Sequence, residues 1–296
     1  MPSLPLKDRA WRVRVAGLEF TELHVDFEVF KSLKHEPNTC TLKVYNLSAT
    51  SRATIEQLNI YDPKRSKSAT AKAATQTGVK KGNITTEILA GYANPGPSLV
   101  FTGQLRRGLS TWDGDTWTTV VEGEDGGRTV FDRRVSNSYP PGTPKLQVIS
   151  ALAEAMGVGL GNIAEVLPEL AGAVFSSGTV VDGCAADEMK RLLRSSKLQY
   201  SVQNGAMQFT RNGAGAAGLV VQAYPLSELT GLVGKPARNA TGEIQVTSLL
   251  VPGIVPGGYI ALTSKEVQGL FRVMSVRTVG SSYGTEWYHQ MLVLPA

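Results

Sequence analysis

The stretch Glu36-Pro-Asn-Thr-Cys-Thr-Leu-Lys-Val-Tyr-Asn-Leu-Ser48 decides the fold class of this chain. Leu42 and Val44 alternate with polar residues, which is the period of a strand that is buried on one face. The alternation then stops, and the Ser48 hydroxyl can accept a backbone N–H bond at the start of a helix. The stretch therefore predicts a half-buried strand, a turn and a short helix.

The strand period extends to both sides of this stretch. Residues 11–44 accommodate two or three strands, and Ile55 and Leu58 give the predicted helix one apolar face. An Asp-Gly pair, which supplies the positive φ angles of a tight hairpin, lies within Trp112-Asp113-Gly114-Asp115. Residues 1–135 are thus predicted to form a β-barrel or sandwich with one helix, and its further strands are expected at Ile84–Tyr92, at Leu99–Gln104 and on both sides of that hairpin.

A small α/β domain is predicted for residues 136–212. Thr143 and Pro144 fit the N-cap and first position of a helix whose apolar stripe runs from Leu146 to Met156 and stops at Gly157. A second helix is expected at Ala185–Ser195. A hairpin around Asn204-Gly205 should follow, with strands at Leu198–Val202 and Met207–Thr210.

The tract at 212–218, rich in Gly and Ala, is predicted to be a linker to a second β domain at residues 213–296. Its strands are expected at Gly242–Leu250, Tyr259–Leu262, Leu270–Val279 and Trp287–Leu294, with a turn at Ser281–Gly284. The predicted fold class is mainly β with α+β character, in which two β domains flank a small α/β domain.

Composition places the chain among globular proteins, with 42% hydrophobic and 19% charged residues. The balance of 30 Lys and Arg against 25 Asp and Glu gives a net charge of +5, which permits acidic partners without requiring them. No apolar run approaches the roughly 18 residues that a membrane span needs, and the N-terminal residues lack the apolar core of a signal peptide. We expect a soluble protein without a membrane span.

Residue patterns for catalysis or metal binding are missing from the sequence. His24, His35 and His289 have no metal-binding spacing, and Cys40 and Cys184 form neither a CxxC pair nor a disulfide framework. Both cysteines are expected to be small buried residues. The sequence predicts no catalytic residue, no cofactor and no metal site.

Acidic residues offer one alternative, a cell-wall-degrading enzyme. Such an enzyme needs two acids that flank a sugar bond, and Glu122, Glu124 and Asp125 form a cluster. The cluster adjoins a Gly-rich segment with Arg128, so a solvated turn is the preferred interpretation. Asp113 and Asp115 lack the later ligands of a calcium loop and are interpreted as hairpin residues.

A basic tract at residues 64–81 contains no acid. Its lysines could bind nucleic acid by releasing counterions, but no aromatic residues are interleaved to stack on bases. A loop that contacts an acidic neighbouring subunit is the preferred interpretation. The predicted partner-contact residues are Lys64, Arg65, Lys67, Lys72, Lys80 and Lys81.

The opening stretch, in which a strand ends in Tyr-Asn-Leu-Ser48, resembles the N-terminal barrel of bacteriophage tail baseplate hub proteins, as in contractile-tailed phages. The segments Ile88–Tyr92 and Val100–Gly103 match the next strands of that family in order. The resemblance continues through the Thr-Pro start of the middle helix, Arg191-Leu-Leu193, Asn204-Gly205, Leu250–Gly253, Val255–Gly257, Gly269–Val273 and Glu286–Tyr288.

This resemblance implies two tail-tube-like β-barrel domains and a structural, non-enzymatic subunit. Three chains would form a homotrimeric ring that joins the tail tube to the central spike. The implied partners are further copies of this chain, the tail tube protein, the spike protein and baseplate wedge or tape-measure proteins, with genomic DNA only in transit through the lumen. The implied location is the virion, after assembly in the host cytoplasm. Another tube-fold protein, such as a distal tail or tube-initiator protein, is the nearest alternative.

Overall fold

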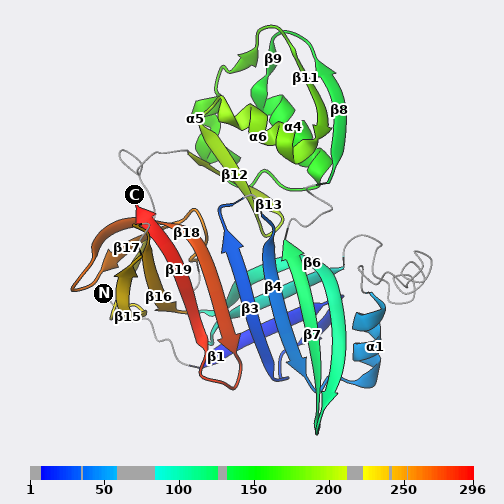
Figure 1. Cartoon of the computed structure of the whole chain (residues 1–296), viewed down its shortest axis with the longest axis vertical. Coiled ribbons are helices and arrows are strands. Elements are labelled where there is room, and N and C mark those ends of the chain that lie inside the picture. Colours follow the sequence, from blue (N-terminus) through cyan, green and yellow to red (C-terminus); the bar gives the residue numbers. More distant parts are fainter. Residues whose placement is uncertain are drawn as a thin grey trace. The chain divides into compact units, whose positions relative to one another are not determined.

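The computed structural model describes residues 8–34, 36–58, 84–125, 132–211, 223–239, 242–251 and 253–296. The chain is mainly β, as predicted, and most of its strands belong to one large sheet (Figure 1). It divides into two compact units. The first comprises Met1–Ser32, Thr39–Asp125 and Gly218–Ala296, and the second comprises Leu33–Asn38 and Gly126–Ala217.

The N-terminal segment forms four strands where two or three were predicted: β1 Arg9–Val15, β2 Leu18–Phe20, β3 Val25–Ser32 and β4 Asn38–Tyr45. The unforeseen strand is β2, which pairs with β1 across a tight turn. Ala16 and Gly17 make this turn with φ angles of 53° and 84°. Only Gly adopts such angles without strain, so the pattern of apolar residues gave no sign of the turn.

The short helix α1 (Ala49–Gln57) starts as predicted, because the Ser51 N–H donates to the Ser48 side chain at 3.1 Å. Ile55 and Leu58 are fully buried. The helix packs on β6 (Gly96–Asp113) at Gly108, where a Cβ atom would lie 2.4 Å from the Ile55 side chain. A glycine is therefore required for the helix to approach this strand.

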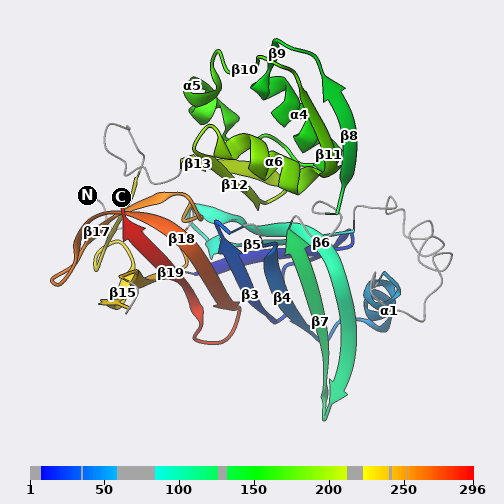
Figure 2. The ribbon, with the colours of Figure 1, turned by 45° about the horizontal axis from the view of Figure 1, so that its top comes forward.

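The long strand β6 joins two neighbours in succession. Its first part pairs with β5 (Thr85–Tyr92) and its second part pairs with β7 (Thr116–Asp125), with a register shift between Leu105 and Arg107. The β6–β7 hairpin turns at Gly114, whose φ is 63°, as the Asp-Gly pair predicted. In Figures 1 and 2 this hairpin extends well past the ends of β3 and β4.

The C-terminal segment adds six strands: β14 Ala223–Ser227, β15 Leu232–Arg238, β16 Ile244–Leu249, β17 Tyr259–Thr263, β18 Gln268–Ser281 and β19 Trp287–Pro295. The last four agree with the predicted strands. Strands β14 and β15 were not predicted. Each contains a proline, which weakens the strand signal in a sequence.

Both β segments belong to one continuous sheet, in the order β15-β16-β19-β18-β3-β4-β7-β6-β5-β1-β2. Strand β18 pairs with β17 over its first residues and then, after a register shift near Val273, pairs with β3 from Ser275 to Ser281. The buried apolar residues of this unit nevertheless form two clusters. One lies mainly among β1 to β7, and the other lies among β14 to β19.

The second unit contains two helices, α4 and α6 (Figure 2). They contribute to an apolar cluster that belongs to this unit. Its elements are β8 Arg134–Tyr139, β9 Thr143–Pro144, α4 Lys145–Met156, η1 Ile163–Val166, α5 Leu167–Leu170, β10 Val174–Phe175, β11 Thr179–Cys184, α6 Ala185–Arg194, β12 Leu198–Gln203 and β13 Ala206–Arg211. Both predicted helices and the Asn204-Gly205 hairpin are present. The elements between α4 and α6 were not predicted, nor was β8.

Helix α4 starts one residue later than predicted. Its N-cap is Pro144, and Thr143 pairs with Phe175 and bonds the carbonyl of Pro140. The end is as predicted, because Gly157 has a left-handed φ of 71°.

The three-domain division at residues 135 and 212 stays a prediction. The described chain has three apolar clusters but only two compact units, and the predicted linker at 212–218 lies outside the described residues.

Candidate functional site

The acidic cluster lies on a strand, so its prediction as part of a turn was wrong. Glu122, Glu124 and Asp125 belong to the end of β7. Glu122 lies 4.0 Å from the Arg107 guanidinium, and Glu124 forms an ion pair with Arg106. Asp125 is buried because strand alternation turns it toward the opposite face. Arginines of the neighbouring strand therefore hold both glutamates, and the third carboxylate does not face the same side.

Two of the three histidines are described, and they occupy unrelated places. His24 precedes β3, whereas His289 lies within β19 and is buried. His35 lies outside the described residues. Cys40 is buried as predicted, but Cys184 is only half-buried at the start of α6, and neither forms a disulfide. In the described part of the chain, no group of three or more His, Cys, Asp or Glu residues could hold a metal ion.

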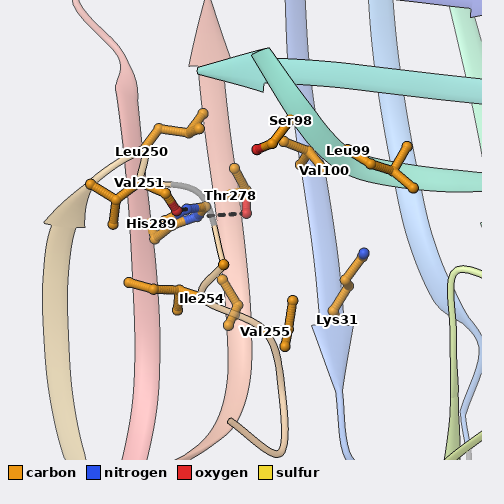
Figure 3. Close-up of a pocket in the computed structure, with 12 residues that line it drawn as sticks. Lys31, Ser98, Leu99, Val100, Leu250, Val251, Ile254, Val255, Thr278 and His289 are labelled. Carbon is orange, nitrogen blue, oxygen red and sulfur yellow. Dashed lines mark hydrogen bonds between the residues drawn. The ribbon is translucent and has the colours of Figure 1, made fainter. Parts of the chain in front are cut away.

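His289 is held in one neutral form by two hydrogen bonds (Figure 3). Its Nε2 lies 3.1 Å from the Val251 carbonyl, which only accepts, so Nε2 carries the proton. Its Nδ1 then accepts from the Thr278 hydroxyl at 2.8 Å. Burial lowers the pKa of His289 to about 4, against the effect of the Val251 carbonyl, and nearby Lys31 lowers it further. This histidine is a structural residue.

A small cavity of about 30 Å³ adjoins His289 and the Lys31 side chain (Figure 3). Lys31 is the last residue on the buried face of β3, and its exposed fraction is only 5%. Burial lowers its pKa to about 8, although the Asp125 carboxylate favours the charged form. A cavity of this volume has room for about one or two waters and is too small for an organic ligand.

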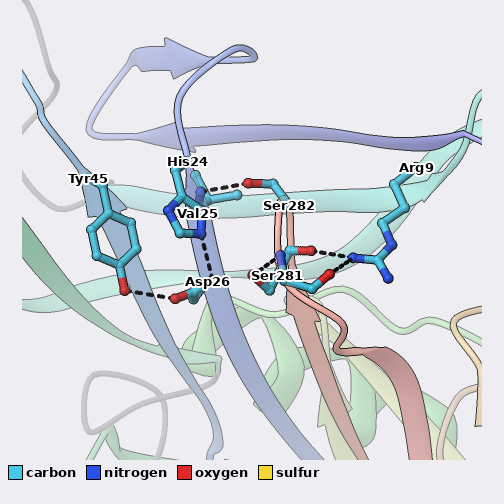
Figure 4. A network of polar contacts seen from close by, with 8 residues as sticks. Arg9, His24, Val25, Asp26, Tyr45, Ser281 and Ser282 are labelled. Carbon is cyan, nitrogen blue, oxygen red and sulfur yellow. Dashed lines mark hydrogen bonds and ion pairs between the residues drawn. The ribbon is translucent and has the colours of Figure 1, made fainter.

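Arg9 fastens the β18–β19 turn to the start of β1 (Figure 4). Its guanidinium donates to the carbonyls of Ser281 at 2.8 Å and Thr285 at 3.1 Å, and also to that of Gly284. It also lies 5.3 Å from the ring centroid of Trp287. The guanidinium fork satisfies several carbonyls at once, which a lysine could not do from one position.

A second polar group in Figure 4 joins β3 to β4. The Tyr45 hydroxyl donates to Asp26 at 2.7 Å, and His24 Nε2 lies 3.2 Å from the other carboxylate oxygen. Burial opposes ionisation of Asp26, yet the bonds from Ser281 and Tyr45 and the adjacent His24 hold its pKa below the usual value. Burial and Asp26 raise the pKa of Tyr45 to about 12. These contacts join the residue before β3 and the start of β3 to the end of β4.

The described surface of the first unit has an apolar projection at the end of the β6–β7 hairpin. Trp112 is 53% exposed, whereas Leu109, three positions earlier and so on the other face of β6, is 44% exposed. The ring of Trp112 lies 5.3 Å from that of its cross-strand partner Trp117, and the Arg52 guanidinium lies 3.9 Å from the Trp117 centroid. The six predicted contact residues of the basic tract, Lys64 to Lys81, lie outside the described residues.

A groove of about 390 Å³ lies elsewhere on the same unit. Its lining includes Arg9, Tyr92, Val233, Trp287 and Tyr288. It combines aromatic rings with one guanidinium, and Asp8 contributes a carboxylate. Tyr92 and Trp287 are only 5% and 3% exposed, so the groove offers little aromatic surface. Among the described residues, no helix is long and apolar enough to cross a membrane.

No family model and no curated protein matches the chain. Three solved structures resemble it along nearly its whole length. A tail protein from Neisseria meningitidis MC58 has a TM-score of 0.63 at 11% identity, with 98% of this chain and 97% of that chain covered. The 43 kDa tail protein of prophage MuSo2 from Shewanella oneidensis has a TM-score of 0.59 at 9% identity, with 97% and 98% covered.

The third structure is an E. coli component of the type VI secretion system, described as similar to the bacteriophage T4 tail proteins gp27 and gp5. Its TM-score is 0.55 at 10% identity, with 96% of this chain and 76% of that chain covered. At such identities the likeness concerns the fold. The chain therefore has the fold of phage tail proteins, as its resemblance to baseplate hub proteins predicted.

Proposed function

We propose that this chain is a structural baseplate hub subunit of a phage tail, three copies of which form a ring between the tail tube and the central spike. The observation that carries the proposal is the shared fold over almost the full length of two tail proteins, with 97% or more of each chain covered. A match to both β segments and the intervening unit together is more specific than a match to one barrel.

The arrangement of the first unit supports a ring that matches a sixfold tube. Two β segments, each with its own apolar cluster, lie side by side in one sheet through the β3–β18 pairing. If each segment occupies the place of one tube subunit, three chains present six such places. This proposal keeps the two tail-tube-like barrels that the resemblance implied.

The partners follow from that place in a tail. They are the other two chains, the tail tube protein, the spike protein, and wedge or tape-measure proteins, with genomic DNA passing through the lumen. The chain is located in the virion and is not an enzyme. The contacts of Glu122 and Glu124 with Arg107 and Arg106 support this last point, because a general acid must be free to protonate its substrate.

The mass of the full chain in solution tests the proposal. We expect a particle of three chains and a stoichiometry of three per assembled tail. Six chains per ring would favour a distal tail or tube-initiator protein instead. A stable monomer that never enters tails contradicts the proposal.

A separate assay tests the enzyme alternative. We expect no clearing of purified peptidoglycan. Clearing that is lost in both Glu122→Gln and Glu124→Gln would make this chain a cell-wall-degrading enzyme.

A further inference from the structure

The chain crosses between its two compact units at the ends of three neighbouring strands. Strand β3 ends at Ser32 and the second unit starts at Leu33, whereas β4 starts at Asn38 and the first unit resumes at Thr39. Strand β7 ends at Asp125, directly before the next crossing. Because β3, β4 and β7 are adjacent in the sheet, these three crossings gather at one end of it (Figure 1).

Two buried ionisable residues lie at this end of the three strands. Lys31 is the residue before the last of β3, and Asp125 is the last residue of β7. Their exposed fractions are 5% and 1%. Lysine and aspartate are rarely buried to this extent, because water solvates their charged forms better than the protein interior does. The strand ends that carry the crossings therefore hold charges that burial disfavours.

The surroundings of Lys31 do not compensate fully for its burial. The Asp125 carboxylate on β7 attracts the ammonium, but the effect of burial is larger, and the pKa of Lys31 falls to about 8. Two further titratable groups interact with Lys31. They are the Cys40 thiol on β4, whose pKa is raised by burial, and His289 on β19, which is neutral. At neutral pH the sheet therefore retains a poorly solvated ammonium at the crossings.

A short displacement would bring the Lys31 amine to water. The small cavity beside it has room for about one or two waters. Leu99 and Val255 line the same cavity and are 45% and 39% exposed, so its wall reaches the surface of the unit (Figure 3). The Lys31 side chain therefore lies close to solvent although it is buried.

The crossing segment Leu33–Asn38 is fastened within the second unit. The Asn38 side chain is buried, and its amide donates to the Val202 carbonyl at 2.8 Å and to the Gln203 side chain at 3.0 Å, both on β12. We therefore expect this segment to move with the second unit. The weaker point lies on the other side of the crossings, where burial acts against the charge of Lys31.

We propose that the ends of β3 and β7 open locally as a hinge that carries the second unit, and that the buried Lys31 ammonium sets how often they open. The open state exposes Lys31 to water and separates it from Asp125. Hinges are a few residues at the ends of elements, and local opening occurs where the structure is least stable. This inference goes beyond the proposed function and does not depend on it.

The open fraction should follow the charge of Lys31. In the open state the amine has its ordinary pKa of 10.5, against about 8 in the closed state. Between these values the open state binds more protons, so the open fraction falls as the pH rises, by about tenfold from pH 7 to pH 9. Exposure of the Cys40 thiol would act in the opposite direction by allowing it to ionise. The pH series is therefore measured in Cys40→Ala.

Amide hydrogen exchange in the full chain tests the opening. At pH 7.5 we expect the amides of residues 30–32 and 123–125 to exchange faster than global unfolding allows. Lys31→Met should slow this exchange by about tenfold or more, because it removes the buried charge. Asp125→Asn should speed it, because it removes the countercharge. Lys43→Met, which changes an exposed lysine on β4, is the matched control and should leave it unchanged.

The opposite signs of the two substitutions distinguish this role from a simple loss of packing, which would speed exchange in both variants. If Lys31→Met does not slow exchange at the strand ends, or if the open fraction does not fall between pH 7 and pH 9, Lys31 does not control the opening.

A distance measurement between the two units tests the hinge itself. Spin labels are placed at Thr41→Cys on β4 and Ser138→Cys on β8, both exposed, after Cys40→Ala and Cys184→Ser remove the native thiols. The distance distribution should become narrower with Lys31→Met and broader with Asp125→Asn. A distribution that neither substitution changes would mean that the strand ends fray without moving the second unit, and the hinge would be overturned.

Discussion

The Thr278 hydroxyl lies 2.8 Å from His289 Nδ1, between directly paired positions of β18 and β19. Both residues are buried, and the Val251 carbonyl holds the other imidazole nitrogen. A buried histidine with two polar partners invites a catalytic interpretation. Here its two nitrogens instead tie β19 to Thr278 of β18 and to the backbone at Val251.

Removing the hydroxyl should leave a buried acceptor without a donor. We expect Thr278→Val to lower the free energy of unfolding by about 1–3 kcal/mol. In a double-mutant cycle with His289→Phe, the coupling energy should be about 0.5–3 kcal/mol, measured by urea denaturation at pH 7. Thr278→Ser keeps the hydroxyl and is the control. Additive effects of the two substitutions would show that the bond contributes nothing.

The buried imidazole should also make the protein sensitive to acid. Burial lowers the pKa of folded His289 to about 4 from its ordinary value of 6.5. The unfolded chain therefore binds more protons between these values, and stability falls as the pH falls through this window. The full loss from this group is about 3 kcal/mol. Denaturation at pH 7 and pH 4.5 should show a smaller loss in His289→Gln than in wild type, whereas Thr278→Ser should keep the wild-type slope.

Lys31 should make stability rise in alkali. Burial lowers its pKa to about 8 from the ordinary value of 10.5. Between these values the unfolded chain binds more protons than the folded chain, so the free energy of unfolding increases with pH, by about 3 kcal/mol in total. Lys31→Met should lack this increase when denaturation is measured from pH 7.5 to 10. Lys43→Met, which changes an exposed lysine on the neighbouring strand, should retain it.

Gly280 of β18 is required by the ring of Phe27 on β3. A Cβ atom at position 280 would lie 2.2 Å from that ring, which is buried and packs edge-on against Trp287. Gly280→Ala should cost about 1–3 kcal/mol of stability through overpacking. When Phe27→Leu is added to Gly280→Ala, it should restore part of the lost stability. Phe27→Leu alone should be destabilising, because it creates a cavity.

Thermal unfolding of the Gly280 variants gives the measurement. The matched control is Gly159→Ala, where the new Cβ would lie 3.6 Å from its nearest neighbour. If Gly280→Ala and Gly159→Ala lowered the stability equally, a clash with Phe27 would not be the cause.

Much of the fold can be predicted from the sequence because local signals suffice. The Ser48 cap, the Gly157 stop and the Asp113-Gly114 turn each depend on residues within a few positions of one another. Pairing partners carry no such signal. Strands with proline, such as β14 and β15, escaped prediction, and the sheet that joins β3 to β18 was not foreseen.

The exposed Trp112 and the groove were missed for a related reason. The sequence places Trp112 beside a hairpin turn, but strand alternation alone does not say whether it lies in the core or in solvent. Its exposure follows from the length by which the hairpin passes α1 and β4. The groove combines residues from β1, β5, β15, β16 and β19, which no short stretch of sequence brings together.

The pairing of β3 with β18 has a consequence for synthesis. Glu28 and Arg277, which form an ion pair across these strands, are 249 positions apart. Contacts between such distant residues slow folding, and β3 keeps an open edge on the ribosome until residues 275–281 emerge. During that interval the nascent chain is exposed to wrong strand partners, so its yield should depend on chaperones and on the rate of translation.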